Sequence, residues 1–364
     1  MTDISNRKNQ INDAFEPNYA TIEIMKHYLQ KNIPEFHKNF ELLNYIKTGT
    51  TGILYKVKAK NIRNKQYYVL KFCEQKNGPY KYIQEIILHK KLHHNNINKL
   101  FGIYKVKDNN NFFTLSEFAK YGNLNDFLIK FLKRPILSES FINFFSKPIL
   151  EALDYLRRNK LIHTNIKNGN IVIDSELNPK IIDFSNVFLY EGYKPDDIIK
   201  LPLIGTGRYM APEILNETEF EIKYGDKIDI YSFGVTLYNL AFGYYPYDLN
   251  NAQGDDFKNI KEKLNKENLV FPNDYKISKM FINFLKNVLE KDYKKRYNIK
   301  EALEDPWIKG WDIINEEKEN IVIEENFVNF FVKLSTDTIP EFNEYITLFY
   351  SIYFHFIFIK ILFF

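Results

Sequence analysis

Residues 161–173 read LIHTNIKNGNIVI, and this stretch decides how the rest of the chain is interpreted. Its first part is a polar loop with one histidine, one lysine and three asparagines, and an apolar, β-branched run typical of a buried strand follows. A second apolar run ends in the carboxylate of Asp183. Two short strands that bring Lys167, Asn170 and Asp183 toward one place predict a site for metal and phosphate.

Length and composition restrict the class of protein. A chain of 364 residues is too long for one compact core, so two lobes with extensions are expected. An apolar fraction of 45% is ample for folding. The net charge of +4 gives no electrostatic case for nucleic acid as a partner.

The single cysteine and the N-terminal residues bear on the compartment. Cys73 cannot form an internal disulfide, which fits a reducing compartment. It could act as a reactive thiol, but its place in an apolar strand favours a buried, inert side chain. Residues 1–18 are polar and contain no apolar core of signal-peptide length, so a cytoplasmic location and a flexible N-terminus are expected.

Residues 345–364 form an aromatic and aliphatic run that is about long enough to cross a bilayer. A tail anchor facing the cytosol is one interpretation, and it is the only route by which the sequence suggests membrane contact. His355 and Lys360 lie inside the run and are costly in hydrocarbon. The alternatives are a tail that packs on the folded domain and an artefact of gene prediction.

Residues 40–119 predict a small sheet with one helix. The helix is expected over 80–92, where apolar residues recur at helical spacing around Glu85. Gly49 and Gly52 bracket a turn between the first two strands. The predicted strands cover 42–47, 53–57, 67–72, 97–106 and 112–117.

From Leu124 onward the pattern becomes helical. Asn123 and Ser138 are expected to cap the first two helices. The segment 228–242 is apolar on all faces, which predicts a helix buried at the centre of this region. The predicted helices cover 124–133, 141–158, 228–242, 257–264, 277–289 and 299–303.

In this order, the features resemble the eukaryotic-type protein kinase family over residues 40–312. The resemblance implies an α+β fold with two lobes, namely a β-rich N-lobe over 40–119 with one key helix and a larger helical C-lobe over 120–312. Residues 1–39 are then an N-terminal extension, and 313–364 are a C-terminal tail with an apolar end.

The N-lobe motifs resemble a nucleotide site. Residues 46–54, IKTGTTGIL, are similar to the glycine-rich loop, with Lys47 in place of its first glycine. On their own, the two glycines also fit an ordinary hairpin turn. Lys71 resembles the strand lysine that holds phosphates, and residues 115–119 resemble the hinge beside the adenine. The resemblance implies ATP contacts from Lys47, Gly49, Gly52, Leu54, Lys71, Glu85, Leu115, Glu117 and Ala119.

The stretch 161–173 resembles the catalytic loop H-R-D-x-K-x-x-N. His163, Lys167 and Asn170 match it, whereas Thr164 and Asn165 replace its arginine and aspartate. Residues 183–185, DFS, resemble D-F-G except at the third position. The resemblance implies that Asn170 and Asp183 would hold Mg²⁺ and that Asn165 and Lys167 occupy the catalytic positions.

Further motifs continue the resemblance toward the C-terminus. Residues 210–213, MAPE, look like the end of the activation segment, and Arg296 stands where the family has the partner of Glu213. Asp229 resembles the helix carboxylate that braces the catalytic loop. Lys167 together with residues 205–209, GTGRY, is similar to the Ser/Thr class.

The departures from the family pattern concern catalysis more than binding. Asn165 can accept a hydrogen bond, but it has neither useful basicity nor charge. Thr164 removes the arginine that would pair with a phosphorylated activation segment, so phosphorylation of Thr206 or Tyr193 is expected to be a weak switch. Ser185 adds a Cβ where glycine allows unusual φ values.

Three functions remain open from the sequence. The first is a Mg-ATP-binding pseudokinase that regulates client proteins in signalling through a nucleotide-stabilised conformation. The second is a Ser/Thr protein kinase of low turnover, because a loose transition state leaves room for a residual rate without a base. The third is a scaffold that does not need nucleotide.

Overall fold

The computed structural model describes residues 19–49, 52–60, 66–73, 80–106, 111–133, 135–251, 256–272 and 277–310. The chain divides into two units after Lys309, and the first of them holds both lobes. The apolar run 345–364 lies outside the described residues, as does the N-terminal stretch 1–18. Within the described ranges, no helix is both long and apolar enough to cross a membrane.

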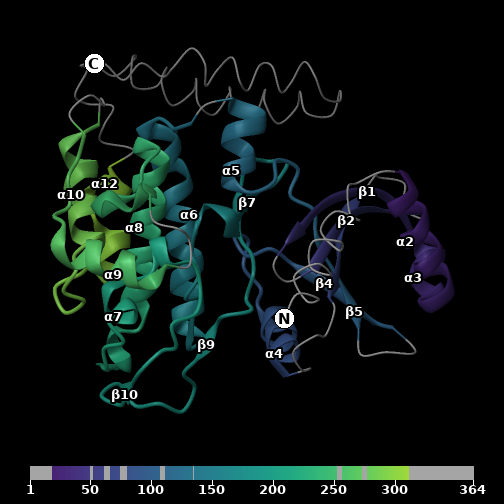
Figure 1. The fold of residues 1–364 in the computed structure, drawn as a ribbon, viewed down its shortest axis with the longest axis horizontal. Coiled ribbons are helices and arrows are strands. Elements are labelled where there is room, and N and C mark those ends of the chain that lie inside the picture. The colour runs from purple at the N-terminus through teal and green to yellow at the C-terminus, as the bar shows by residue number, and fades with distance from the viewer. Residues whose placement is uncertain are drawn as a thin grey trace, which may run out of the picture. The chain divides into compact units, whose positions relative to one another are not determined.

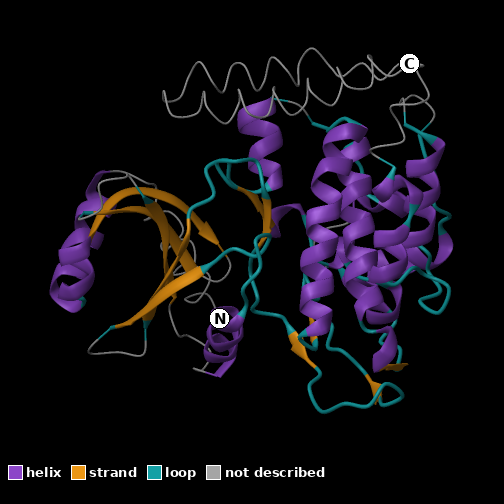
Figure 2. Ribbon diagram, turned by 180° about the vertical axis from the view of Figure 1, so that it is seen from behind, coloured by secondary structure: helices purple, strands orange, loops and turns teal. Residues whose placement is uncertain are grey.

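The N-lobe is built on five antiparallel strands, in agreement with the prediction (Figures 1 and 2). Their spatial order is β1-β2-β3-β5-β4. The strand expected over 97–106 is shorter than predicted, because Ile97 instead makes an isolated bridge to Ile181 of the C-lobe. The elements are β1 (Phe40–Gly49), β2 (Gly52–Ala59), β3 (Tyr67–Cys73), α4 (Tyr80–Lys91), β4 (Leu100–Lys105) and β5 (Phe112–Glu117). Cys73 is buried, as expected.

Two helices that the sequence did not predict precede the sheet. They are α2 (Tyr19–Asn32) and α3 (Pro34–Asn39), and Figure 1 shows both beside β1. Leu29, Ile33 and Phe36 are buried in the same apolar core as the strand residues of the lobe. Phe36 stacks on Phe40 with ring centroids 4.9 Å apart. The second half of the N-terminal extension is therefore part of the N-lobe core.

Ile33→Val is expected to lower the free energy of unfolding by about 0.5–1.5 kcal/mol, because it removes one methylene from a closely packed core. Ile33 is 7% exposed. The matched control is Ile24→Val on α2, where the isoleucine is 70% exposed and the same change should have almost no effect. Urea denaturation of both variants measures the difference. Equal effects of the two substitutions would show that these helices do not belong to the core.

The C-lobe is helical and surrounds α8 (Asp226–Phe242). All residues of α8 except Asp226 and Asn239 are buried, which confirms the prediction of a central helix. The remaining helices are α5 (Leu124–Asp126), the π-helical turn η1 (Phe127–Leu132), α6 (Glu139–Arg158), α7 (Pro212–Leu215), α9 (Phe257–Lys266), α10 (Lys279–Val288), α11 (Ile299–Glu304) and α12 (Pro306–Lys309). The two lobes confirm the α+β, bilobal class.

The two expected helix caps behave differently. Asn123 caps α5 through a reciprocal pair of hydrogen bonds with Asp126, as predicted. Ser138 occupies the capping position of α6, but its hydroxyl lies 3.0 Å from the hydroxyl of Ser140 and makes no capping bond. The prediction for Ser138 was therefore right in position and wrong in its hydrogen bond.

Short pairs of strands flank the polar loops between the lobes. β6 (Leu161–Ile162) pairs with β9 (Phe188–Leu189), and β7 (Ile171–Ile173) pairs with β8 (Pro179–Ile181). The segment 94–98 before β4 joins β8 by two backbone hydrogen bonds of 2.8 and 3.0 Å between Asn96, Asn98 and Ile181. The end of β8 thus lies against the N-lobe segment 94–98.

Candidate functional site

The buried helix α8 anchors the loop between β6 and β7. Asp229 is 2% exposed, and its two carboxylate oxygens accept hydrogen bonds from the backbone N–H groups of His163 (2.7 Å) and Thr164 (2.8 Å). Thr164 takes a left-handed backbone conformation with φ of 63°. Its hydroxyl donates to the carbonyl of Asn186 at 2.7 Å, so it ties the loop to the segment after β8. The start of the loop is thus held from two sides.

Asn165 and Lys167 converge on one hydroxyl. The Lys167 ammonium donates to Thr206 Oγ1 at 2.6 Å, and this hydroxyl donates in turn to Asn165 Oδ1 at 3.5 Å. Asn165 is 7% exposed. The sequence contains no carboxylate between residues 161 and 173, so the position beside Lys167 has an amide where the family motif has an acid.

Asn170 and Asp183 lie together at the ends of paired strands. The backbone N–H of Ile182 donates to the carbonyl of Asn170 at 2.9 Å, which holds the two segments side by side. The Asn170 amide group donates through Nδ2 to the carbonyl of Asn165 at 2.8 Å, so Oδ1 is the side-chain atom that could hold a metal. An amide oxygen and a carboxylate are hard donors that fit Mg²⁺.

The pKa of Asp183 lies below its usual range. Burial alone would raise it, but the hydrogen bond from the Ser185 hydroxyl and the positive charge of Lys71 outweigh that effect. The carboxylate is therefore ionised at neutral pH, which is the form that metal binding requires.

Strand register decides which N-lobe residues share a face with Lys71. Directly paired residues of antiparallel neighbours lie on the same face of a sheet. Lys47 pairs with Leu54, Leu54 with Lys71, and Lys71 with Thr114, so these four residues form one row. The predicted contacts Lys47, Leu54 and Lys71 are thus brought together.

Leu115 does not join that row. It pairs with Leu70, and both belong to the buried core under α2 and α3. Because side chains alternate along a strand, the β5 residues on the Lys71 face are Thr114 and Ser116. The prediction placed Leu115 beside the nucleotide because of its position in the sequence. Sequence position alone does not show on which face of the sheet a strand residue lies.

The remaining predicted contacts lie around the same sheet. At Gly52, φ is 146° and an added Cβ would lie 2.0 Å from the carbonyl oxygen of Phe72, so only glycine fits. Gly49 pairs with it across the turn. Glu117 pairs with Lys180 of β8 at 2.5 Å and links the end of β5 to the C-lobe, while Ala119 is buried just beyond. Glu85 lies on α4, and its side chain is outside the described residues.

Two histidines, the buried His163 and the half-buried His89, pack on Phe184, and the sequence did not single out His89. The ring centroids of His89 and His163 lie 4.7 and 5.3 Å from that of Phe184. Burial lowers the pKa of each to about 4. Each ring also contacts a backbone carbonyl, that of Asn98 at 2.5 Å and that of Ile182 at 3.2 Å. Both are therefore neutral in the folded chain at pH 7.

Acidification from pH 6.5 toward 4 is expected to lower the free energy of unfolding. The unfolded chain protonates His89 below the ordinary histidine pKa of 6.5, whereas the folded chain does so only near 4. His89→Leu should reduce the stability loss between pH 7.5 and 5 by about 1–2 kcal/mol relative to wild type. His93→Leu, at an exposed position, is the control. An unchanged pH dependence of the urea midpoint in His89→Leu would contradict this assignment.

The segment from 186 to 213 is held by contacts within the chain. β10 (Ile198–Ile199) pairs with β11 (Phe220–Glu221), and Lys223 forms an ion pair of 2.8 Å with Asp196. At its end, Glu213 forms a buried ion pair with Arg296, with N–O distances of 2.7 and 2.8 Å. These contacts hold the segment on both sides of Thr206 in sequence.

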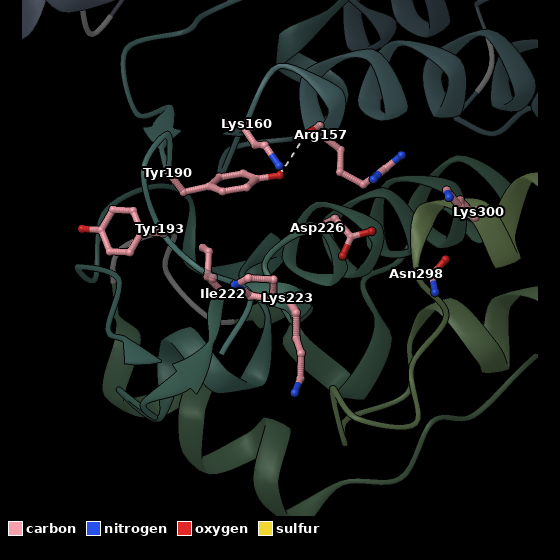
Figure 3. Close-up of a pocket in the computed structure, with 10 residues that line it drawn as sticks. Arg157, Lys160, Tyr190, Tyr193, Ile222, Lys223, Asp226, Asn298 and Lys300 are labelled. Atoms are coloured by element: carbon pink, nitrogen blue, oxygen red, sulfur yellow. Dashed lines mark hydrogen bonds between the residues drawn. The ribbon is translucent and has the colours of Figure 1, made fainter. Parts of the chain in front are cut away.

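A cavity of about 330 Å³ lies behind this segment, and none of the predicted site residues lines it (Figure 3). Figure 3 shows the Tyr190 hydroxyl pointing toward the backbone carbonyl of Arg157, to which it donates at 2.9 Å. Arg157 pairs with Asp154 and Lys223 with Asp196, so two cations of the lining are already matched by acids of the chain. These two side chains therefore add little net positive charge to the cavity.

A family model described as "Protein kinase domain" matches residues 40–308. The chain is 30% identical over 232 residues to the cell cycle serine/threonine-protein kinase CDC5/MSD2 of Saccharomyces cerevisiae, which covers 63% of this chain and 30% of that protein. It is 29% identical over 240 residues to the probable serine/threonine-protein kinase KCC4 of the same organism, covering 66% and 22%.

A third relative is similar over more of its own length. It is a probable myosin light chain kinase of Dictyostelium discoideum, 26% identical over 276 residues, with 74% of this chain and 83% of that protein covered. The matched region spans less than a third of the length of each of the two yeast relatives. The matches thus agree on one domain and differ in what surrounds it.

Proposed function

Because this chain belongs to the protein kinase family, we propose that it binds Mg-ATP between its lobes and transfers phosphate to protein hydroxyls slowly or not at all. In this proposal it acts on client proteins as an allosteric regulator whose conformation the nucleotide stabilises. The observation that carries the proposal is Asn165, a buried amide beside Lys167 at the position of the catalytic base. The kinase family in general uses ATP and Mg²⁺ and acts on proteins.

Nucleotide binding is supported by the residues that remain. Lys71 would hold the phosphates with Glu85 as its partner, and Asn170 and Asp183 would hold Mg²⁺, which neutralises phosphate charge when bound. Lys167 would contact the γ-phosphate. Backbone amides near Gly49 and Gly52 would approach the phosphates, and Leu54 with Ala119 would border the adenine.

Slow transfer is supported by the chemistry of Asn165. General-base catalysis contributes about 10²–10⁴-fold, and an amide cannot take the proton of a substrate hydroxyl. Its Oδ1 already accepts from Thr206, which further occupies the atom that would orient that hydroxyl. Proximity and charge neutralisation would still act, so a residual rate is compatible with the site.

One contact favours the alternative, a Ser/Thr kinase of low turnover. Lys167 is held at 2.6 Å from Thr206, in a geometry that needs no phosphorylation to form. The named relatives are Ser/Thr kinases or a light chain kinase by name. The two functions differ only in whether Asn165 permits measurable turnover.

A nucleotide-dependent shift of melting temperature tests the binding step. Saturation at about 100 times the dissociation constant should stabilise the wild type by about 2.7 kcal/mol. Lys71→Met should abolish the shift, whereas Lys105→Met, which changes an exposed lysine on the same sheet, should preserve it. No shift of the wild type at saturating Mg-ATP would contradict nucleotide binding and leave the scaffold function.

Single-turnover transfer from labelled Mg-ATP to a generic protein substrate tests the second step. If the protein is a pseudokinase, the transfer rate of the wild type should be close to that of Lys71→Met. A wild-type rate well above Lys71→Met would favour the low-turnover kinase instead.

A further inference from the structure

Ser185 makes a contact that the glycine of the family motif cannot make. Its hydroxyl donates to Asp183 Oδ1 at 2.7 Å, and its backbone N–H also interacts with the same carboxylate. Ser185 does not lie at positive φ, so the serine is accommodated without left-handed strain. Asp183 is the strained residue here, with φ of 69°. One oxygen of Asp183, the proposed metal ligand, thus accepts a hydrogen bond from the chain itself.

The neighbouring ligand, Asn170, also offers one oxygen. Asn170 donates through its amide nitrogen to the carbonyl of Asn165, which leaves Oδ1 as its single donor atom for a metal. The Oδ2 atom of Asp183 is likewise the oxygen that is not held by the Ser185 hydroxyl. Each of the two protein ligands therefore offers one oxygen.

Cations differ in how they use such oxygens. Mg²⁺ requires near-octahedral geometry and takes single oxygens at about 2.0–2.1 Å, whereas Ca²⁺ takes six to eight oxygens and readily binds both oxygens of a carboxylate. We propose that Ser185 is a positioning residue that makes Asp183 a one-oxygen ligand and so favours Mg²⁺ over Ca²⁺ at the nucleotide site. This inference rests on the proposed binding of Mg-ATP.

Two effects of the Ser185 hydroxyl oppose each other. Its hydrogen bond draws charge from the carboxylate and weakens metal binding slightly, but it also fixes the orientation of the ligand. Loss of such an outer hydrogen bond typically costs 10- to 100-fold in metal affinity, so orientation outweighs charge. Because the backbone N–H of Ser185 remains in an alanine variant, the lower end, about 10-fold, is expected.

The test titrates MgCl₂ and, separately, CaCl₂ into the full chain at a fixed ATP concentration, with melting temperature as the readout. Ser185→Ala should raise the Mg²⁺ midpoint by about 10-fold. It should also lower the ratio of the Ca²⁺ midpoint to the Mg²⁺ midpoint, so that the preference for Mg²⁺ decreases. Ser185→Thr keeps the hydroxyl and should retain the wild-type values. Ser175→Ala, at an exposed position between β7 and β8, is the matched control.

The melting temperature without nucleotide or metal separates positioning from a general loss of stability. It should be the same in Ser185→Ala and wild type. The inference about Ser185 would be wrong, and the proposed function would stand, under two conditions. The wild type would show a shift with Mg-ATP, and Ser185→Ala would have a Mg²⁺ midpoint or a midpoint ratio within about two-fold of wild type. A wild type without any nucleotide-dependent shift would overturn the proposed function and this inference with it.

Discussion

Asn165→Asp is expected to raise the rate of phosphate transfer by about 100- to 10,000-fold. The substitution keeps the shape of the side chain and replaces an amide by a group that can take a proton from the attacking hydroxyl. The hydroxyl of Thr206 can still donate to position 165, and the new negative charge lies beside the Lys167 ammonium. The site therefore needs no rearrangement to accept the carboxylate.

Single-turnover transfer from labelled Mg-ATP, with the protein in excess, measures the gain. Asn125→Asp adds the same charge at an exposed position of α5 and should leave the rate unchanged. The double variant Asn165→Asp/Lys71→Met should lose the gain, because phosphate positioning fails. If wild type and Asn165→Asp are equally fast and both exceed Lys71→Met, the amide is not what limits this protein, and the pseudokinase proposal is wrong.

Arg296→Met is expected to lower the free energy of unfolding by about 3–5 kcal/mol. Arg296 is fully buried, and its guanidinium donates to both oxygens of Glu213 and to the carbonyls of Glu290 and Lys227. Methionine fills a similar volume but leaves the Glu213 carboxylate buried without its counter-charge. The cost comes from that isolated charge more than from the lost attraction.

Equilibrium denaturation measures this loss. Arg158→Met is the matched control, because its side chain is 60% exposed in a pair with Asp154 and should change stability by less than about 1 kcal/mol. Glu213→Leu in the Arg296→Met background removes the isolated carboxylate and should recover part of the loss. A loss in Arg296→Met no greater than in the control would show that the pair is not buried in solution.

The sequence was most informative where a local pattern of residues is sufficient to predict the structure. A helix that is apolar on every face has no polar face to expose to water, so residues 228–242 were expected to be buried. The helix α8 is buried in the structure. The order of the glycine turn, Lys71, the loop 161–173 and Asp183 was enough to identify the family. The protein kinase family model matches residues 40–308.

The sequence was least informative where a strand has two faces or a helix has no clear stripe. Leu115 and Thr114 are adjacent, and only the pairing of Leu70 with Leu115 shows that Leu115 faces the core. α2 and α3 were missed because their burial depends on a sheet that is formed by later residues. The hydrogen bond from Ser185 to Asp183 depends on the backbone conformation between them.

By itself, the sequence determined the family, the two lobes and the loss of a carboxylate at position 165, because these follow from residue identity and local periodicity. The tertiary structure alone decided which side chains meet. Arg296 reaches Glu213 across 83 positions, and Asp229 reaches the backbone of His163 across 66. Such contacts are set by the packing of whole elements, and packing depends on the shape of every neighbour rather than on any single stretch of chain.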